Sequence, residues 1–200
     1  MNRRLLHNDG AAASQGLARV AAIVYANEIY PDAVFSTLVE RGRAMGLTLA
    51  GVVQHRAFVG GDRRCDVVLE DLATGHRTAL FENRGTAARG CRLDQAALVE
   101  ATARVEGSLE HAPQLLVLNK FGKVECEGGG LRDLIASAID REIPVIIGVP
   151  IRSLDAWQGF AGEFATELRD DANQIAAWLE GVAAVSPGLQ RAGQGLERPG

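Results

Sequence analysis

A group of polar and charged side chains follows one short apolar run, residues 115–118 (LLVL). A run that is apolar at every position is typical of a strand buried on both faces of a parallel sheet. Asn119 and Lys120 come directly after it, and Lys123 and Glu125 follow shortly behind. Open α/β sheets bind ligands at the carboxyl ends of their strands, so we expect the chemistry of this chain here.

Lysine occurs in the chain only at these two positions, although lysine and arginine together number 21. A lysine carries its charge on a compact ammonium group, whereas an arginine presents a planar fork, and the two are not interchangeable at a binding site. One interpretation is that Lys120 and Lys123 place point charges beside a ligand. The alternative is that both lie on a solvated loop, and the sequence leaves both open.

A second basic segment, residues 82–94, carries three arginines separated by glycines: Arg84, Arg89 and Arg92. Guanidinium forks and exposed backbone N–H groups are the two ingredients of an oxyanion site. The alternative is a solvent-facing loop whose positive charge is balanced by the acids at its two ends. The two lysines behind the apolar run favour the first interpretation.

Composition argues against several classes of function. The net charge of -4 disfavours a general nucleic-acid binder or a protein attracted to anionic membranes, so any anion site must be local. No apolar run approaches the roughly 20 residues of a membrane span, and the apolar stretch at the amino end is too short for a signal peptide. We therefore expect a cytoplasmic protein that does not insert into membranes.

The three cysteines, Cys65, Cys91 and Cys126, are widely spaced and form no CxxC motif. This spacing predicts neither a disulfide framework nor a zinc site, and no metal site is expected. Reduced thiols are the expected state, and the sequence assigns them no role.

The chain alternates between buried strands and amphipathic helices. Apolar runs predict strands at residues 18–25, 47–54, 115–118 and 144–151, and a turn at 73–76 predicts a β-hairpin formed by 65–72 and 77–81. Helical spacing of apolar residues predicts helices at residues 33–45, 95–110, 131–142, 153–160 and 171–185. The pattern predicts one α/β domain over residues 18–185: a three-layer αβα fold with a mostly parallel sheet and an added hairpin. Residues 1–17 and 186–200 are expected to be a disordered leader and tail.

Helix ends and large aromatic residues give further expectations. Asp32 and Asp94 are expected to cap the helices that follow them, and Gly46 to end the first helix in the left-handed conformation. Trp157 and Trp178 are expected to close the core rather than to anchor a partner.

The segment after the first strand, residues 25–37 (YANEIYPDAVFST), is where a nucleotide-binding P-loop would stand. A P-loop holds phosphate with glycine-rich backbone amides and a lysine. This segment contains neither glycine nor lysine, and its two acids, Glu28 and Asp32, would repel a triphosphate. Hydrolysis of ATP or GTP by the P-loop route is therefore not expected.

Four segments give the chain a family resemblance: GLTLAGVVQ at 46–54, CDVVLEDLATG at 65–75, RGTAARGCRLD at 84–94 and LLVLNKFGKVECEGGGLRD at 115–133. Through them, from about Arg19 to Gly162, the chain resembles the uncharacterised bacterial family known as domain of unknown function 2478. Genes of that family often lie beside molybdate-transport genes, so the resemblance implies a role in molybdenum handling.

More distantly, the order of elements is similar to that of small P-loop nucleoside-triphosphatases, in which the third strand ends in Asp-Glu and a Gly-x-x-Glu turn follows. Gly122 and Glu125 fit that turn, but Asn119 and Lys120 stand in place of the two acids. These substitutions remove Mg²⁺ ligands and negative charge. The resemblance therefore implies the fold without the hydrolysis.

The leading hypothesis is a non-hydrolytic, degenerate P-loop-like protein that binds a small oxyanion, molybdate or tungstate, or a phosphorylated ligand. The expected ligand-binding residues are Arg84, Arg89, Arg92, Asn119, Lys120 and Lys123. Apart from molybdate or a nucleotide, no cofactor is expected, and the sequence leaves the oligomeric state open.

Two alternatives remain. An atypical nucleotide phosphohydrolase would use Glu125 or Glu127 as its general base. A protein-interaction module would dock a transporter or cofactor-assembly partner through an edge strand, the hairpin or residues 157–160. The sequence thus leaves open whether the protein is an enzyme, and the missing P-loop residues favour a binder.

Overall fold

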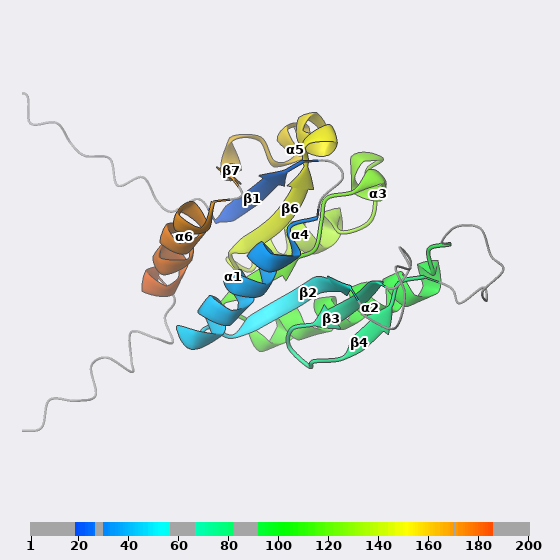
Figure 1. The fold of residues 1–200 in the computed structure, drawn as a ribbon, viewed down its shortest axis with the longest axis horizontal. Helices are drawn as coiled ribbons and strands as arrows, with labels where there is room; N and C mark the ends of the chain where they lie inside the picture. Colours follow the sequence, from blue (N-terminus) through cyan, green and yellow to red (C-terminus); the bar gives the residue numbers. More distant parts are fainter. Residues whose placement is uncertain (1–18, 27–29, 57–66, 82–91, 170, 186–200) are drawn as a thin grey trace, which may run out of the picture.

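The computed structural model describes residues 19–26, 30–56, 67–81, 92–169 and 171–185 (Figure 1). The strands are β1 (Val20–Tyr25), β2 (Leu49–Arg56), β3 (Val67–Asp71), β4 (Arg77–Ala79), β5 (Leu115–Leu118), β6 (Val145–Pro150) and β7 (Ala165–Arg169). The α-helices are α1 (Asp32–Ala44), α2 (Gln95–Ser108), α3 (Lys123–Cys126), α4 (Arg132–Asp140), α5 (Leu154–Ala161) and α6 (Ala172–Val185). The predicted leader and tail lie outside the described residues.

The strands form one sheet in the order β4-β3-β2-β5-β6-β1-β7. β2, β5, β6, β1 and β7 run parallel, with Leu116 of β5 opposite Val145 of β6, while β3 and β4 continue the sheet in antiparallel pairing. The predicted hairpin therefore extends one edge of a mostly parallel sheet. This arrangement confirms the predicted fold class.

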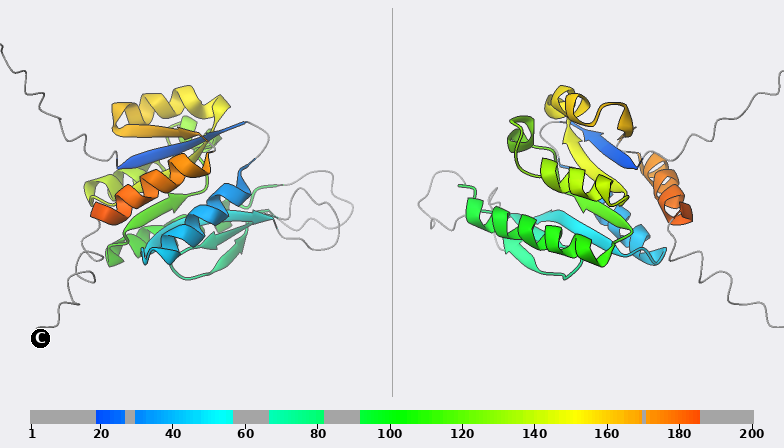
Figure 2. Two further views of the ribbon diagram at one scale, coloured as in Figure 1. Left: turned by 60° about the vertical axis from the view of Figure 1, so that its left-hand side comes forward. Right: turned by 180° about the vertical axis from the view of Figure 1, so that it is seen from behind.

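Helices cover both faces of the sheet, so the fold has three layers (Figure 2). α1 and α6 pack on one face, where Phe35, Leu38 and Trp178 join the core. α2, α4 and α5 pack on the other, where Val105, Ile135 and Trp157 do so. β5 and β6 lie between these layers and are buried at every position, as their uninterrupted apolar sequences require.

One of the two predicted N-caps is observed in the structure. The side chain of Asp94 accepts a hydrogen bond from the Ala97 backbone N–H at 2.9 Å and caps α2, as predicted. The prediction for Asp32 was wrong, because α1 begins one residue earlier and Asp32 is its first residue, behind Pro31. Gly46 follows α1 with a positive φ of 78°, in agreement with its predicted conformation.

Two elements were not predicted. α3 occupies the turn after β5, and β7 pairs with β1 at the edge of the sheet, where only Leu168 is fully buried. Ile139, although apolar, is 41% exposed near the end of α4. Trp157 and Trp178 are buried, at 1% and 5% exposed, as expected of residues that close a core.

Candidate functional site

The carboxyl ends of three neighbouring parallel strands lie side by side in the middle of the sheet. β5 ends at Leu118, β6 at Pro150 and β1 at Tyr25, in the spatial order β5-β6-β1. Asn119 and Lys120 leave β5 at this edge, which is where open α/β sheets bind their ligands. The residues around these ends are called the strand-end cluster below: Tyr25, Tyr30, Asp32, Gln54, Asn119, Lys120 and Arg152.

Asn119 is buried, with 8% of its surface exposed. Its side-chain N–H group donates a long hydrogen bond of 3.4 Å to Oε1 of Gln54 on β2, and no described residue donates to its buried Oδ1. Gly148 of β6 packs closely against this strand end. If Gly148 carried a side chain, its Cβ would lie 2.6 Å from the backbone oxygen of Asn119 and 3.2 Å from the Phe35 ring. The strand end thus holds Asn119 firmly and leaves one amide acceptor unused.

The charge of Lys120 interacts with that of a second cation, Arg152, which belongs to the 3₁₀ turn that follows β6 (Ile151–Ser153). Lys120 is exposed to solvent, yet enough protein surrounds its ammonium group that desolvation lowers its pKa from the usual 10.5. The charge of Arg152 lowers this pKa further, whereas the carboxylate of Glu125 opposes the shift. Among the described residues no ion pair or hydrogen bond holds the Lys120 ammonium. Two positive charges therefore act on each other near the ends of β5 and β6.

The Lys120 stem folds back toward the start of α3. A Cβ built on Gly122 would lie 3.5 Å from Cε of Lys120, so the side chain passes over this glycine. Lys123, the other lysine, is the first residue of α3. Its side chain is 87% exposed, and its Nζ lies 3.6 Å from Oε1 of Glu127. The structure therefore places one lysine in the strand-end cluster and the other on the solvated face of the turn.

Glu125 is buried, and it fastens the turn that carries both lysines. Its Oε2 accepts a hydrogen bond from the Gly122 backbone N–H at 2.7 Å, and its Oε1 accepts one from the Leu131 backbone N–H at 3.0 Å. Gly130 has a φ of +62°, and a Cβ there would overlap this carboxylate. Both oxygens of Glu125 are thus used within the protein, and a glycine makes room for them.

Two tyrosines lie at the β1 side of the cluster. The ring centroids of Tyr25 and Tyr30 are 5.8 Å apart, edge to face, and Tyr30 stacks on Phe35 at 5.3 Å. Burial raises the pKa of Tyr25 to about 12, although the charge of Arg152 opposes the shift and that of Asp32 adds to it. Burial also raises the pKa of Tyr30 well above its usual value. Both hydroxyl groups therefore keep their protons at neutral pH, and that of Tyr30 is hydrogen-bonded to the Gln54 backbone.

The predicted arginines are placed differently. Arg84 and Arg89 lie outside the described residues. Arg92 is exposed and precedes Leu93, which bridges to Phe81 beyond β4. β4 is three strands away from β5, roughly 14 Å at the usual strand spacing of about 4.8 Å. The structure therefore brings Asn119 and Lys120 together and sets Arg92 on the hairpin side.

Arg152 was missed by the sequence interpretation. The signal was available but slight: a single cation two residues beyond the end of an apolar strand. Only the order of the strands, which the sequence does not give, shows that β6 is the neighbour of β5.

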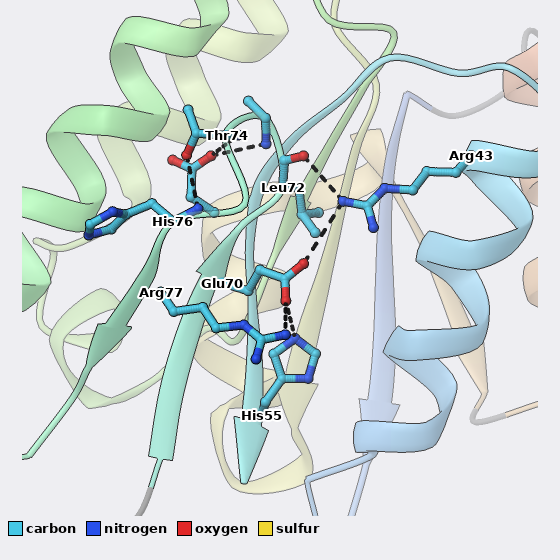
Figure 3. A network of polar contacts seen from close by, with 9 residues as sticks. Arg43, His55, Glu70, Leu72, Thr74, His76 and Arg77 are labelled. Atoms are coloured by element: carbon cyan, nitrogen blue, oxygen red, sulfur yellow. Dashed lines mark hydrogen bonds and ion pairs between the residues drawn. The ribbon is translucent and has the colours of Figure 1, made fainter. Parts of the chain in front are cut away.

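A separate polar network joins α1 to the hairpin (Figure 3). The Glu70 carboxylate on β3 accepts a hydrogen bond from Arg77 at 3.0 Å, lies 3.2 Å from Nε2 of His55 and lies 4.0 Å from Arg43 of α1. Its side chain is only 15% exposed, so three basic groups surround one nearly buried carboxylate. We call these four residues the hairpin network.

The neighbouring turn is closed by Asp71. Its Oδ1 accepts hydrogen bonds from the backbone N–H groups of Ala73 and Thr74, at 3.0 and 2.9 Å (Figure 3). Gly75 follows with a φ of +73°, which a side chain would strain. The hairpin network and its turn thus have a structural use.

Two further properties of the described residues bear on function. They contain no group of three histidine, cysteine, aspartate or glutamate side chains that could hold a metal ion. In the same ranges no helix combines the length and apolar character needed to cross a bilayer. Cys126 is a free thiol, and Cys65 and Cys91 lie in segments that are not described.

A family model described as "Protein of unknown function (DUF2478)" matches residues 20–178. The chain belongs to this family. A curated relative is the "Molybdenum import ATP-binding protein ModC 2" of Bradyrhizobium diazoefficiens, which is 34% identical over 160 residues. That match covers 80% of this chain but 18% of the relative, so the chain spans less than a fifth of the relative's length.

Two solved structures share the fold. THEP1 from the hyperthermophile Aquifex aeolicus superposes with a TM-score of 0.52 at 15% identity, covering 80% of this chain and 93% of that one. A human cancer-related nucleoside triphosphatase superposes with a TM-score of 0.57 at 14% identity, covering 90% of this chain and 100% of that one. At these identities the likeness shows the fold, which is P-loop NTPase-like, as the sequence predicted.

Proposed function

We propose that this protein binds a small oxyanion or a phosphorylated ligand at the strand-end cluster without hydrolysing it. Lys120 and Arg152 supply the positive charge. The side chain of Asn119 and the tyrosine hydroxyl groups orient the ligand, and Lys123 adds electrostatic attraction from the exposed turn next to the cluster. The predicted contribution of Arg84 and Arg89, which lie outside the described residues, stays part of the proposal, whereas Arg92 lies on the hairpin side and is left out of it.

One observation carries the proposal: the positive charges of Lys120 and Arg152 act on each other, and the Glu125 carboxylate that also acts on Lys120 accepts hydrogen bonds from two backbone N–H groups. Like charges held together at a sheet edge repel each other, and a bound anion would relieve that repulsion. Each charge-assisted hydrogen bond stabilises a complex by roughly 1.5 to 3 kcal/mol. Two such bonds supply roughly 3 to 6 kcal/mol, which corresponds to dissociation constants from about millimolar to tens of micromolar without a metal ion.

Molybdate or tungstate is the first ligand to test, because the ModC 2 relative is named for molybdenum import. Phosphate-bearing ligands are the second choice, because the fold is shared with a nucleoside triphosphatase. Molybdate, tungstate and the phosphate group are all tetrahedral and negatively charged, so each suits a site that offers cations and O–H or N–H donors.

Binding without hydrolysis is proposed because the strand end, as far as its residues are described, does not present the groups that nucleotide hydrolysis uses. Asn119 and Lys120 occupy the strand end where the resembled nucleoside-triphosphatases carry two acids, so a Mg²⁺ ion lacks its usual ligands. Glu125 was the candidate base of the alternative hypothesis, but both of its oxygens accept backbone hydrogen bonds. These bonds hold the carboxylate in the turn and stabilise its charged form, which makes it a weaker base, so the geometry supports a binder.

The interaction-module alternative has less support. It relied in part on aromatic side chains of residues 157–160 as anchors. Trp157 is buried and packs edge-on against Phe121 at 5.3 Å, so it belongs to the core.

Isothermal titration calorimetry tests the proposal with molybdate, tungstate, sulfate, phosphate and ATP. We expect at least one tetrahedral anion to bind, and Lys120→Met and Arg152→Met each to weaken binding by roughly 10- to 150-fold, the equivalent of one charge-assisted contact. Arg41→Met, which removes the same charge from the exposed far end of α1, is the matched control. Absence of binding to all five compounds, or equal affinity in wild type and Lys120→Met, would refute the proposal.

A further inference from the structure

We propose that this protein forms a symmetric dimer in which a second copy of the chain packs over the groove between α1 and α6. The groove carries Arg41 on its α1 side and Glu180 on its α6 side. Two-fold pairing brings each of these charges against the opposite charge of the other copy. The inference goes beyond the proposed anion site and does not rest on it.

α1 and α6 lie side by side on one face of the sheet (Figure 2). Between them is a groove of about 300 Å³, and the residues that line it are Arg41, Ala44, Met45, Ala176, Leu179 and Glu180. Leu179 is 1% exposed and so lies at the bottom of the groove, whereas Arg41 and Glu180 are exposed. The groove therefore has a largely apolar interior and carries one positive and one negative side chain at its rim.

The two charged side chains at the rim are unpaired. Within the described ranges, no ion pair or side-chain hydrogen bond joins Arg41 or Glu180 to another residue. Arg43, two residues further along α1, is by contrast engaged: its guanidinium group donates to the backbone oxygen of Leu72 at 3.3 Å and lies 4.0 Å from Glu70. Two opposite charges thus flank the groove without forming an ion pair across it, and both are available to a partner.

The outer face of α6 presents little charge to solvent. Glu180 is the one charged residue in this helix, and Ala177 and Ala184 are among its exposed residues. A helix at a protein surface usually carries charged and polar side chains on its outer face. Alanine side chains are small enough to let a facing helix approach closely. The exposed side of α6 therefore suits packing against another helix.

A two-fold axis along the groove makes this surface complementary to itself. Such an axis exchanges the two sides of the groove, so it places α1 of one copy over α6 of the other. Each Arg41 then faces the Glu180 of the other copy, which gives two ion pairs, and the apolar interiors cover each other. A two-fold axis across the groove would instead set Arg41 against Arg41, which like charges disfavour. The charges thus select one of the two orientations.

Sedimentation velocity of the full chain over a micromolar concentration series tests the proposal by charge reversal. We expect a monomer–dimer equilibrium in wild type. Arg41→Glu and Glu180→Arg should each raise the dimer dissociation constant by roughly tenfold or more, because each substitution turns two symmetry-related attractions into repulsions. The double variant restores opposite charges, so its dissociation constant should return to within about threefold of wild type.

Glu106→Arg is the matched control, because it makes the same charge change at an exposed position of α2, on the other face of the sheet. Its dimer dissociation constant should equal that of wild type. A wild-type protein that stays monomeric throughout the series would overturn the proposal, and so would a dimer that both single variants leave intact. A double variant that does not regain the dimer would show that Arg41 and Glu180 do not face each other, which would also overturn it.

Discussion

The strand-end cluster and the hairpin network both gather basic side chains, but they treat charge in opposite ways. In the hairpin network, the Glu70 carboxylate faces His55 and the positive charges of Arg77 and Arg43, so basic groups surround a negative one. In the strand-end cluster, Lys120 and Arg152 repel each other, and the nearby Glu125 carboxylate is used by backbone N–H groups. The opposite charges of the hairpin network hold elements in place, whereas the like charges at the sheet edge support the proposed anion site.

The largest expected effect comes from removing the carboxylate that keeps the strand-end turn in shape. Glu125→Ala should lower the free energy of unfolding by about 3 kcal/mol, because it deletes two charge-assisted hydrogen bonds and leaves two backbone N–H groups unpaired. Urea unfolding measures this change. The matched control is Glu127→Ala on the exposed side of the same turn, with an expected change below about 0.5 kcal/mol.

Glu125→Gln separates the structural role from a catalytic one. A stable, folded Glu125→Gln protein that loses phosphate-releasing activity present in wild type would show that the carboxylate acts as a base, which would contradict its purely structural role.

The two tyrosines of the strand-end cluster should make the free energy of unfolding depend on pH in the alkaline range. The pKa of Tyr25 is raised from 10.0 to about 12 in the folded protein because burial disfavours the phenolate, so folding favours the protonated form. Its contribution to stability is complete below pH 10 and is lost as the pH rises toward 12. We expect the free energy of unfolding to fall by about 2 kcal/mol over this window, and by less in Tyr25→Phe.

Ultraviolet absorbance of tyrosinate checks the same shift directly. The sequence contains only two tyrosines, Tyr25 and Tyr30, and both have raised pKa values. The folded protein should show little tyrosinate at a pH of about 10.5, while the protein in denaturant should be more than half ionised. Ordinary ionisation of the folded protein at that pH would mean that these side chains are not packed as described.

Glu70→Gln breaks the hairpin network and should leave the strand-end cluster intact. The expected loss of stability is about 1 kcal/mol, because Arg77 and Arg43 are largely exposed and solvent weakens their attraction. Thermal unfolding measures the loss, and calorimetry should give the same anion affinity as wild type. A fall in anion affinity comparable to that of Lys120→Met would show that the two regions are not independent.

The smallest effect is expected for Lys123→Met. An exposed pair such as Lys123 and Glu127 contributes less than about 0.5 kcal/mol to stability. Because Lys123 acts only from the rim, we expect anion affinity to fall by less than about threefold, against at least tenfold for Lys120→Met. Equal losses in the two variants would place the ligand over α3 instead of over the strand ends.

Much of the fold could be predicted because the central strands are apolar at every position. β5 and β6 were identified from such runs, and the hairpin from its turn and flanking strands. β7 was missed because it is an edge strand with a single fully buried side chain, Leu168, and its conformation depends on pairing with β1. α3 was missed because it is one short turn held by Glu125, and its sequence resembles that of a loop.

The candidate site was predicted in part, for a physical reason. Asn119 and Lys120 follow a recognisable strand, so their place at a sheet edge was foreseeable. Arg152 was not, because its closeness to Lys120 depends on β6 being the neighbour of β5. Lys123 looked equivalent to Lys120 in sequence, but the helical turn of α3 directs it to solvent and to Glu127.

The most direct test of the central claim follows the Lys120 amine by NMR after reductive ¹³C-methylation of the two lysines. Without ligand, the Lys120 signal should titrate below the usual lysine pKa of 10.5, because of burial and the charge of Arg152. Saturating molybdate or phosphate should raise that pKa, since a bound anion favours the ammonium form, and should leave the Lys123 signal unchanged. A Lys120 signal that titrates identically with and without every anion would contradict the claim that the strand ends bind one.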